Sequence, residues 1–190
     1  MIIIIPGLFG TRERYNPLLN KLQKVGLTAK VIDLGLNTRG LKNTSEIVKK
    51  QLTETSEKHD IIAHSFGGIV LKYIIHHYPE VKKNISSIIF VAVPHGGSWQ
   101  ALFLTMVPAA RELLPFRKKI KELAKVSLPE ETVNFIPESE LKVWPRKSGL
   151  LKDYIGIVIP DTNHDNIINS ENFIPKVITF IKSRHDKVFL

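Results

Sequence analysis

The chain has 190 residues, of which 43% are hydrophobic, and this length suits one globular domain with a substantial buried core. It has no cysteine, which excludes disulfides and thiolate metal sites, and no apolar run approaches the roughly 18 to 20 residues of a membrane span. The formal net charge of +9 favours anionic partners, but no nucleic-acid-binding motif accompanies the lysine-rich segments, so we expect no nucleic-acid partner and only weak contact with an anionic membrane surface.

The chain opens on MIIIIPGLFG, residues 1–10. This segment lacks the basic start and the longer apolar region of a secretory signal, so we expect a cytoplasmic protein. Its run of isoleucines instead predicts a short buried strand over residues 2–5.

Short apolar runs rich in β-branched residues alternate with helical patterns along the rest of the chain. The predicted strands lie at 2–5, 28–33, 60–64, 86–93, 132–136 and 154–159, and the clearest helical patterns at 43–55, 66–78 and 172–183. Asn43 is placed as the N-cap of the first of these helices, with Glu46 as the acid of a capping box. The alternation predicts a doubly wound α/β domain, with a mainly parallel sheet of about six strands and helices on both faces.

One serine stands at the junction of a predicted strand and helix, in DIIAHSFGGIV. Ala63 and Gly67 flank Ser65 at positions −2 and +2, and small residues there are what a sharp strand-to-helix turn needs. Such a turn holds the hydroxyl over the carboxyl end of the sheet, where ligands of parallel sheets bind. It also sets the backbone N–H of Phe66 beside the place where an oxyanion would form. The alternative is an ordinary N-cap serine.

Three segments resemble the α/β-hydrolases, and within them the small lipases and esterases. AHSFGG at 63–68 is similar to the nucleophile turn A-H-S-x-G-G of these enzymes. IIIIPGLFG at 2–10 resembles their first core strand and oxyanion loop, with Pro6 in place of the usual histidine. VAVPHGGSW at 91–99 resembles the T-P-H-x-G-S stretch that follows the next strand in many lipase-like members.

The resemblance implies a minimal α/β-hydrolase fold, with residues 1–190 as a single domain and a short apolar cap-like insertion at about 97–130. It implies that Ser65 is the nucleophile and that the backbone N–H groups of Leu8 and Phe66 form the oxyanion hole. Among seven histidines, His164 lies after the last predicted strand and before the last helix, where this family keeps its catalytic base. For His95 we expect a structural hydrogen-bonding role.

The acid that orients the histidine is left open by the sequence. The loop after the penultimate strand is where the family keeps it, and this loop offers Glu138 and Glu140. We rank Glu140 first because Glu140-Leu-Lys-Val143 matches the family spacing of an acid, two residues and valine. Asp161 and Asp165, in the histidine loop itself, are further candidates.

The implied function is hydrolysis of a carboxylic ester, small or lipid-like, with an apolar acyl group, through an acyl-serine intermediate. We expect an acyl pocket lined by Phe9, Leu102, Phe103, Met106 and Val107, no cofactor and no metal. Three alternatives keep the same fold: an acyltransferase, a thioesterase or amidase, and a catalytically silent interaction module.

Overall fold

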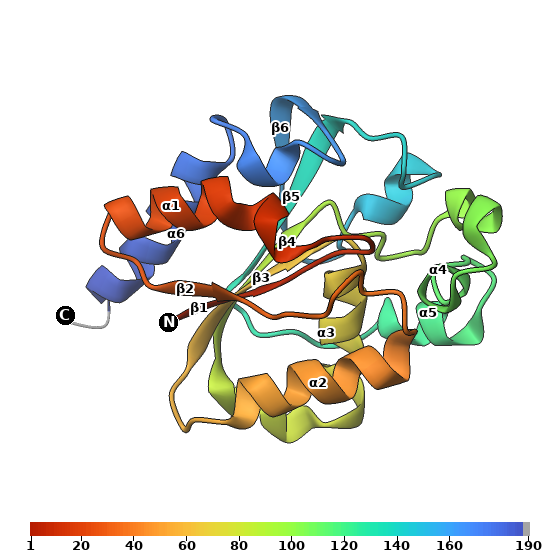
Figure 1. Ribbon diagram of the computed structural model, residues 1–190, viewed down its shortest axis with the longest axis horizontal. Coiled ribbons are helices and arrows are strands. Elements are labelled where there is room, and N and C mark those ends of the chain that lie inside the picture. Colours follow the sequence, from red (N-terminus) through yellow and green to blue (C-terminus); the bar gives the residue numbers. More distant parts are fainter. Residues whose placement is uncertain (188–190) are drawn as a thin grey trace.

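The computed structural model describes residues 1–187 and contains one sheet of six parallel strands in the order β2-β1-β3-β4-β5-β6 (Figure 1). The predicted α/β fold is therefore confirmed. The strands are β1 Ile2–Ile5, β2 Ala29–Val31, β3 His59–His64, β4 Ile85–Val91, β5 Thr132–Ser139 and β6 Ile155–Asn163.

Both faces of the sheet are buried. Successive side chains of a strand point to opposite sides, so a central strand contributes to the apolar cluster on each face. In β1, Ile3 and Ile5 belong to one apolar cluster, whereas Ile2 and Ile4 belong to a second cluster across the sheet. Each of these four side chains is at most 2% exposed. A run of consecutive isoleucines is therefore what a central parallel strand requires.

Helices cover the two faces separately (Figure 1). Leucines of α1 and apolar residues of α6 join the cluster on one face, and residues of α2, α3 and α5 join the cluster on the other. The helices are α1 Asn16–Lys24, α2 Leu41–Thr53, α3 Phe66–His77, α4 Pro108–Arg111, α5 Lys118–Leu123 and α6 Ile174–Lys187, with short 3-10 turns η1 Arg12–Tyr15, η2 Pro79–Asn84, η3 Trp99–Leu104, η4 Arg146–Gly149 and η5 Ile167–Asn169.

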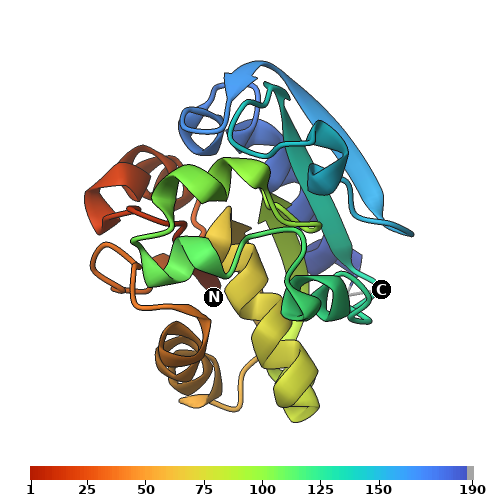
Figure 2. The ribbon, with the colours of Figure 1, turned by 90° about the vertical axis from the view of Figure 1, so that its right-hand side faces the viewer.

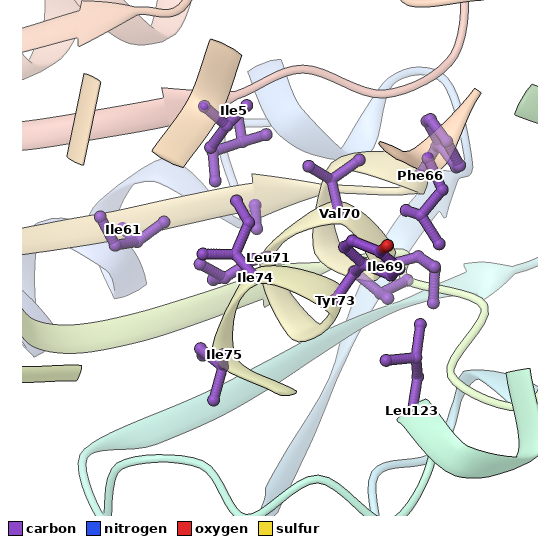
Figure 3. Close-up of a cluster of buried hydrophobic side chains, with 14 of the residues drawn as sticks. Ile5, Ile61, Phe66, Ile69, Val70, Leu71, Tyr73, Ile74, Ile75 and Leu123 are labelled. Atoms are coloured by element: carbon purple, nitrogen blue, oxygen red, sulfur yellow. The ribbon is translucent and has the colours of Figure 1, made fainter. Parts of the chain in front are cut away.

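Helix α3, which begins directly after Ser65, lies at the centre of its cluster (Figure 3). Every residue from Phe66 to Ile75 is buried, because α2 and α5 pack on the sides of α3 that the sheet does not cover. Figure 3 shows Leu123 of α5 facing α3 across this cluster. A helix buried on all sides cannot move without disturbing the core, so the start of α3 is a rigid platform for the residue before it.

The predicted capping box at Asn43 is wrong. Helix α2 begins earlier, at Leu41, after Gly40, whose backbone has φ 87° and ψ 164°. Thr44 already donates its N–H to the carbonyl of Gly40, and its hydroxyl bonds to Asn37. A glycine can enter the helix from a conformation that disfavours other residues, so the chain uses it in place of a side-chain cap.

Residues 97–130 form the segment that we predicted to be cap-like, and this segment has two roles. Its first part, η3 and α4, lies beyond the carboxyl ends of the strands, and its last part, α5, packs against α3 (Figures 1 and 2). Ile120 and Leu123 of α5 are at most 1% exposed, so this turn covers the core. None of the helices within residues 1–187 has the length and apolar composition that crossing a bilayer needs.

Candidate active site

Ser65 lies in a strained turn between β3 and α3. Its backbone has φ 50° and ψ −120°, a conformation that residues other than glycine rarely adopt. The N–H of Ser65 donates to the carbonyl of Val91 at 2.9 Å, which fixes the turn to the neighbouring strand. A Cβ atom on Gly67 would lie 2.4 Å from the carbonyl oxygen of Ile5, so only glycine lets α3 approach β1 this closely. The geometry is that of a nucleophile elbow.

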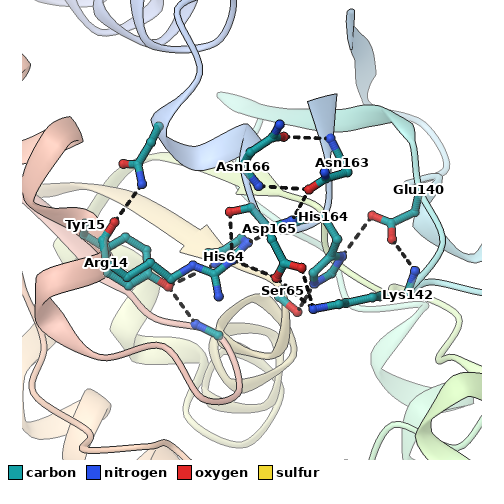
Figure 4. Close-up of polar contacts among 12 residues, drawn as sticks. Arg14, Tyr15, His64, Ser65, Glu140, Lys142, Asn163, His164, Asp165 and Asn166 are labelled. Atoms are coloured by element: carbon teal, nitrogen blue, oxygen red, sulfur yellow. Dashed lines mark hydrogen bonds and ion pairs between the residues drawn. The ribbon is translucent and has the colours of Figure 1, made fainter. Parts of the chain in front are cut away.

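The structure brings Ser65, His164 and Glu140 together in one hydrogen-bonded series (Figure 4). His164 Nε2 lies 2.9 Å from Ser65 Oγ, and its Nδ1 lies 2.9 Å from Glu140 Oε2. Since Nδ1 faces a carboxylate, it carries the ring proton, and Nε2 is then free to accept from the serine hydroxyl. The three residues follow the carboxyl ends of β3, β6 and β5, which lie at the same edge of the sheet.

Glu140 is held by the backbone as well as by the histidine. Its Oε1 accepts hydrogen bonds from the N–H groups of Lys142 at 2.8 Å and Val143 at 3.0 Å. Its side chain is 2% exposed. The carboxylate therefore has a fixed orientation, with one oxygen bound to the loop and the other facing His164.

The rival acids are engaged elsewhere. Glu138 accepts the backbone N–H of Asp161 at 3.1 Å, and this contact is at the exposed surface. Asp165 pairs with Arg14 at 3.0 Å and with Lys142 at 2.6 Å. Partial burial raises the pKa of Asp165, but its hydrogen bonds to Lys142 and Arg14 outweigh this and hold the pKa below its usual value. Within residues 1–187, Glu140 is the carboxylate that bonds to the His164 ring.

The predicted oxyanion donors lie on two turns that meet at Ser65. Phe66 is the first residue of α3, so its N–H has no acceptor inside the helix. Among the described residues, none accepts a hydrogen bond from the Leu8 N–H or from that of Phe66. A Cβ atom on Gly7 would lie 2.9 Å from Cβ of Ser65, which shows how closely the first turn approaches Ser65. Two free N–H groups beside a serine can bind the charge of a tetrahedral intermediate.

A cavity of about 440 Å³ opens directly over Ser65 and His164. Its walls are mostly apolar and come from the turn after β1, from η3 and α4, and from the loop after β5: Leu8, Phe9, Pro94, Ala101, Phe103, Leu104, Ala110, Leu113, Leu141 and Val143. Arg14, Lys142 and Asp165 add polar groups to the lining. This size and composition suit an acyl chain or another small apolar group.

The predicted pocket residues divide into two groups. Phe9 and Phe103 line the cavity. Leu102 does not: it lines a shallow neighbouring hollow. Side chains three apart share a face of a 3-10 turn, so Gln100 with Phe103 and Ala101 with Leu104 reach the cavity. Trp99 and Leu102 share the remaining face and line the neighbouring hollow instead.

Met106 and Val107 are also outside the cavity lining. Met106 follows η3 and is 93% exposed. Val107 is half-buried against the core cluster below, next to the start of α4. The turn geometry of this segment therefore decides which of its apolar side chains face the cavity.

His95 lies in a buried hydrogen-bond network. Lys72 Nζ lies 3.3 Å from His95 Nδ1, and His95 Nε2 lies 3.3 Å from Asn134 Oδ1. The amide of Asn134 donates in turn to the carbonyl of Gly149 at 2.8 Å. Burial, followed by the Lys72 charge, lowers the pKa of His95 well below its usual value, and burial lowers the pKa of Lys72 to about 8. These contacts bind α3, β5 and two loops together.

Sequence reasoning missed Arg14 and Tyr15, on η1 just before α1. Arg14 reaches Asp165, next to His164, and Tyr15 contacts the turn after β1. Pro17 near the start of the helix and the spacing of Leu18 and Leu22 are signals that could have revealed α1. No signal in the sequence links η1 to a loop 150 residues away.

The described residues contain no cluster of three or more histidine, aspartate and glutamate side chains arranged to hold a metal ion. The site itself brings together a serine hydroxyl, an imidazole, a carboxylate and two N–H groups.

The sheet order, the sharp turn at Ser65 and the positions of the following loops define the protein as an α/β-hydrolase-fold protein. The sequence profile of the lecithin:cholesterol acyltransferase family matches residues 38–186, and the chain belongs to this family. A search of curated protein sequences finds no match.

Several solved lipases share the fold. The mature lipase BlEst2 of Bacillus licheniformis is similar with a TM-score of 0.75 and 17% identity, over 95% of this chain and 91% of that one. Lipase B of Aspergillus fumigatus is similar with a TM-score of 0.77 and 16% identity, over 88% of this chain and 48% of the fungal chain. A structure from the metagenome-derived lipolytic enzymes LipS and LipT gives a TM-score of 0.73 and 14% identity, over 96% and 93% of the two chains.

Proposed function

We propose that the protein is a serine hydrolase that cleaves a carboxylic ester with an apolar acyl group through an acyl-serine intermediate. One observation carries the proposal: the hydrogen-bonded series from Glu140 through His164 to Ser65 ends in an apolar cavity of about 440 Å³. A nucleophile, its base and the group that orients the base are the parts that acyl transfer requires.

In the proposed reaction Ser65 Oγ attacks the ester carbonyl carbon while His164 Nε2 takes the hydroxyl proton. The carbonyl oxygen becomes an oxyanion and accepts hydrogen bonds from the N–H groups of Leu8 and Phe66. Glu140 stabilises the imidazolium that forms, and the imidazolium then gives its proton to the leaving alkoxide as the carbon–oxygen bond breaks. Water, activated by the same imidazole, attacks the acyl-serine in the second half and releases the acid.

A second candidate function is transfer of the acyl group to an alcohol or thiol. Membership of an acyltransferase family supports it, and the acyl-serine intermediate is common to both reactions. The two differ only in which nucleophile reaches the acyl-enzyme, so the same site serves either.

We also propose that the substrate is presented at a lipid surface with anionic groups. The cavity lining includes unusually exposed apolar side chains, Phe103 at 85% and Leu141 at 79%. Met106, three residues after Phe103, is 93% exposed. Apolar side chains in this setting suit insertion between lipid chains, and the net charge of +9 favours anionic headgroups.

A fluorophosphonate tests the proposed nucleophile. It should label the wild-type protein on Ser65, as mapped by mass spectrometry, and Ser65→Ala should abolish both labelling and hydrolysis of p-nitrophenyl esters. Ser98 is the matched control, because it also lines the cavity but donates its hydroxyl to the carbonyl of Lys142. Ser98→Ala should still be labelled. Absence of labelling in folded wild-type protein would support the silent interaction module instead.

Product analysis separates hydrolysis from acyl transfer. The enzyme is given a p-nitrophenyl ester with and without an added long-chain alcohol, and free acid and new ester are quantified. Acid as the main product supports hydrolysis, whereas an acyl ester that dominates at millimolar alcohol supports transfer.

Sedimentation with vesicles of phosphatidylglycerol or of phosphatidylcholine tests the proposed lipid surface. Preferential binding to phosphatidylglycerol supports an anionic surface, and equal binding to both lipids, or binding to neither, contradicts it.

A further inference from the structure

The turn after β1 carries Leu8, a proposed oxyanion donor, and is called the oxyanion turn. A buried series of hydrogen bonds connects it to the loop of His164, on the opposite side of His164 from Glu140 (Figure 4). The N–H of Gly7 donates to Tyr15 Oη at 3.0 Å, and Tyr15 Oη lies 3.0 Å from Nδ1 of His64. His64 Nε2 lies 3.3 Å from the backbone carbonyl oxygen of His164. Tyr15 is fully buried and His64 is 1% exposed.

The chemistry of the partners fixes the direction of every bond in this chain. A carbonyl oxygen can only accept, so His64 Nε2 carries the ring proton and donates it to the carbonyl of His164. Burial, with the neighbouring His164 and Arg14 outweighing Asp165, lowers the pKa of His64 well below its usual value, so the ring is neutral. Nδ1 is therefore an acceptor and Tyr15 donates its hydroxyl proton to it. The remaining lone pairs of the tyrosine oxygen accept from Gly7 N–H.

Tyr15 keeps its proton throughout the working range of the protein. Burial is the largest influence on this phenol and outweighs the opposing contact with the Gly7 N–H, and the pKa of Tyr15 is raised to about 12. The series of hydrogen bonds from Gly7 to His164 therefore has a single arrangement of protons. A hydrogen-bonded series whose donors and acceptors are fixed in this way sets the distance between its ends more sharply than packing alone.

Both ends of this chain are attached to parts that must be placed to within a fraction of an ångström. Gly7 immediately precedes Leu8, whose N–H we assign to the oxyanion hole. The carbonyl of Gly7 accepts a hydrogen bond from the N–H of Gly10 at 3.1 Å. The other end holds the backbone of His164 itself. His64 immediately precedes Ser65, so the link passes through the residue next to the proposed nucleophile.

We propose that Tyr15 and His64 are positioning residues that hold the oxyanion turn and the His164 loop in register across Ser65, an inference that rests on the proposed function. Neither side chain exchanges a proton with the substrate. Each acts through the backbone that it holds, Tyr15 on Gly7 and His64 on His164. Without the chain, the donors and the base would each remain present but in a broader range of positions.

The test compares Tyr15→Phe with Tyr154→Phe. Tyr154 is a matched control because its hydroxyl, like that of Tyr15, accepts from one backbone N–H and donates to a second group, here the N–H and the carbonyl of Leu128, in a different part of the fold. Both variants should lose stability in urea unfolding. Tyr15→Phe should in addition lose about 10- to 100-fold in kcat for a p-nitrophenyl ester with KM changed less than about two-fold, whereas Tyr154→Phe should keep wild-type kcat. Equal kcat in the two variants overturns the proposal.

His64 supplies the second half of the test. His64→Leu should lower kcat, and His64→Gln, whose amide can still donate toward the His164 carbonyl, should recover part of the loss. The double variant Tyr15→Phe/His64→Leu should be no slower than the slower single variant, because one broken link already opens the chain. Losses that multiply show two independent effects and overturn the proposal.

Nitrogen-15 NMR of the histidine rings gives a readout that does not depend on activity. Wild-type His64 should show the Nε2–H tautomer, and Tyr15→Phe should shift the ring signals of His164 although the two side chains do not touch. An Nδ1–H tautomer at His64, or unchanged His164 signals, overturns the positioning role even if the protein hydrolyses no ester. Failure of fluorophosphonate to label wild-type Ser65 instead refutes the proposed function and leaves these NMR outcomes to decide on the chain.

Discussion

Replacing Glu140 by glutamine tests how the site controls the tautomer of His164. The amide has nearly the same shape as the carboxylate, but only one of its ends can accept. Because two backbone N–H groups point at Oε1, the amide oxygen is expected to take that place, and the amide nitrogen is then left facing His164 Nδ1. The nitrogen donates to Nδ1, so the ring proton moves to Nε2, where it blocks acceptance of the Ser65 proton.

The size of the loss follows from the alternative orientation. Flipping the amide would restore an acceptor for Nδ1–H but would break both backbone hydrogen bonds, at about 0.5–1.5 kcal/mol each, and leave the buried donors of Lys142 and Val143 unpaired. The active arrangement is therefore disfavoured by several kcal/mol. The imidazolium also loses its anion. We expect kcat to fall about 10³- to 10⁴-fold, the upper value being equivalent to about 5.5 kcal/mol in the activation barrier.

The assay is kcat on a p-nitrophenyl ester, with circular dichroism to establish that the variant is folded. Glu138→Gln and Asp161→Asn are the controls, since these side chains lie outside the His164 contacts in the described structure, and both should stay within about two-fold of wild type. A Glu140→Gln variant that retains a tenth or more of the wild-type kcat refutes the reasoning. A large loss in either control moves the assignment of the acid to that residue.

Gly67→Ala places a methyl group 2.4 Å from the carbonyl oxygen of Ile5, so thermal unfolding should show a loss of about 1–3 kcal/mol together with a lower kcat, and wild-type values of both would show that α3 can shift freely. His64 and His95 have folded-state pKa values well below the unfolded value of about 6.5, so below that pH the unfolded state binds protons that the folded state does not. Stability by urea unfolding should therefore fall as the pH is lowered below about 6.5, with a limiting slope of about 1.4 kcal/mol per pH unit for each histidine, and a flat profile contradicts this. Leu113→Trp should fill part of the cavity and lower the preference for octanoate over acetate esters about ten-fold in kcat/KM, and an unchanged preference would show that the acyl chain lies elsewhere.

The sequence alone determined the sheet and the turn at Ser65. Runs such as IIII at 2–5 can be recognised in the sequence because a central parallel strand is buried on both faces, so every residue of the run has to be apolar. The small residues around Ser65 are readable for a related reason: the clash that a Cβ atom would make at Gly67 involves adjacent elements and depends little on distant ones. The resemblance of the same segments to α/β-hydrolases predicted the fold, which the structure confirms.

Tertiary structure alone decided how the loops meet at the carboxyl end of the sheet. Glu138 and Glu140 are two residues apart and chemically identical, and what separates them is the direction of the chain as it leaves β5 and the two N–H groups that hold one of them. The same is true of the cavity, where the tight turn of η3 selects Ala101 and Leu104 and turns Leu102 away.

The link through Tyr15 and His64 is the clearest case of what a sequence leaves undetermined. Its residues carry no local pattern of their own, because a hydrogen bond between side chains 49 residues apart constrains only the pair and not its neighbours in sequence. Periodicity and turn chemistry reflect only interactions between residues that are close in sequence or lie in one element. Contacts between the ends of different strands depend on the packed arrangement of the whole sheet, and only that arrangement brings Tyr15, which follows β1, to His64 at the end of β3.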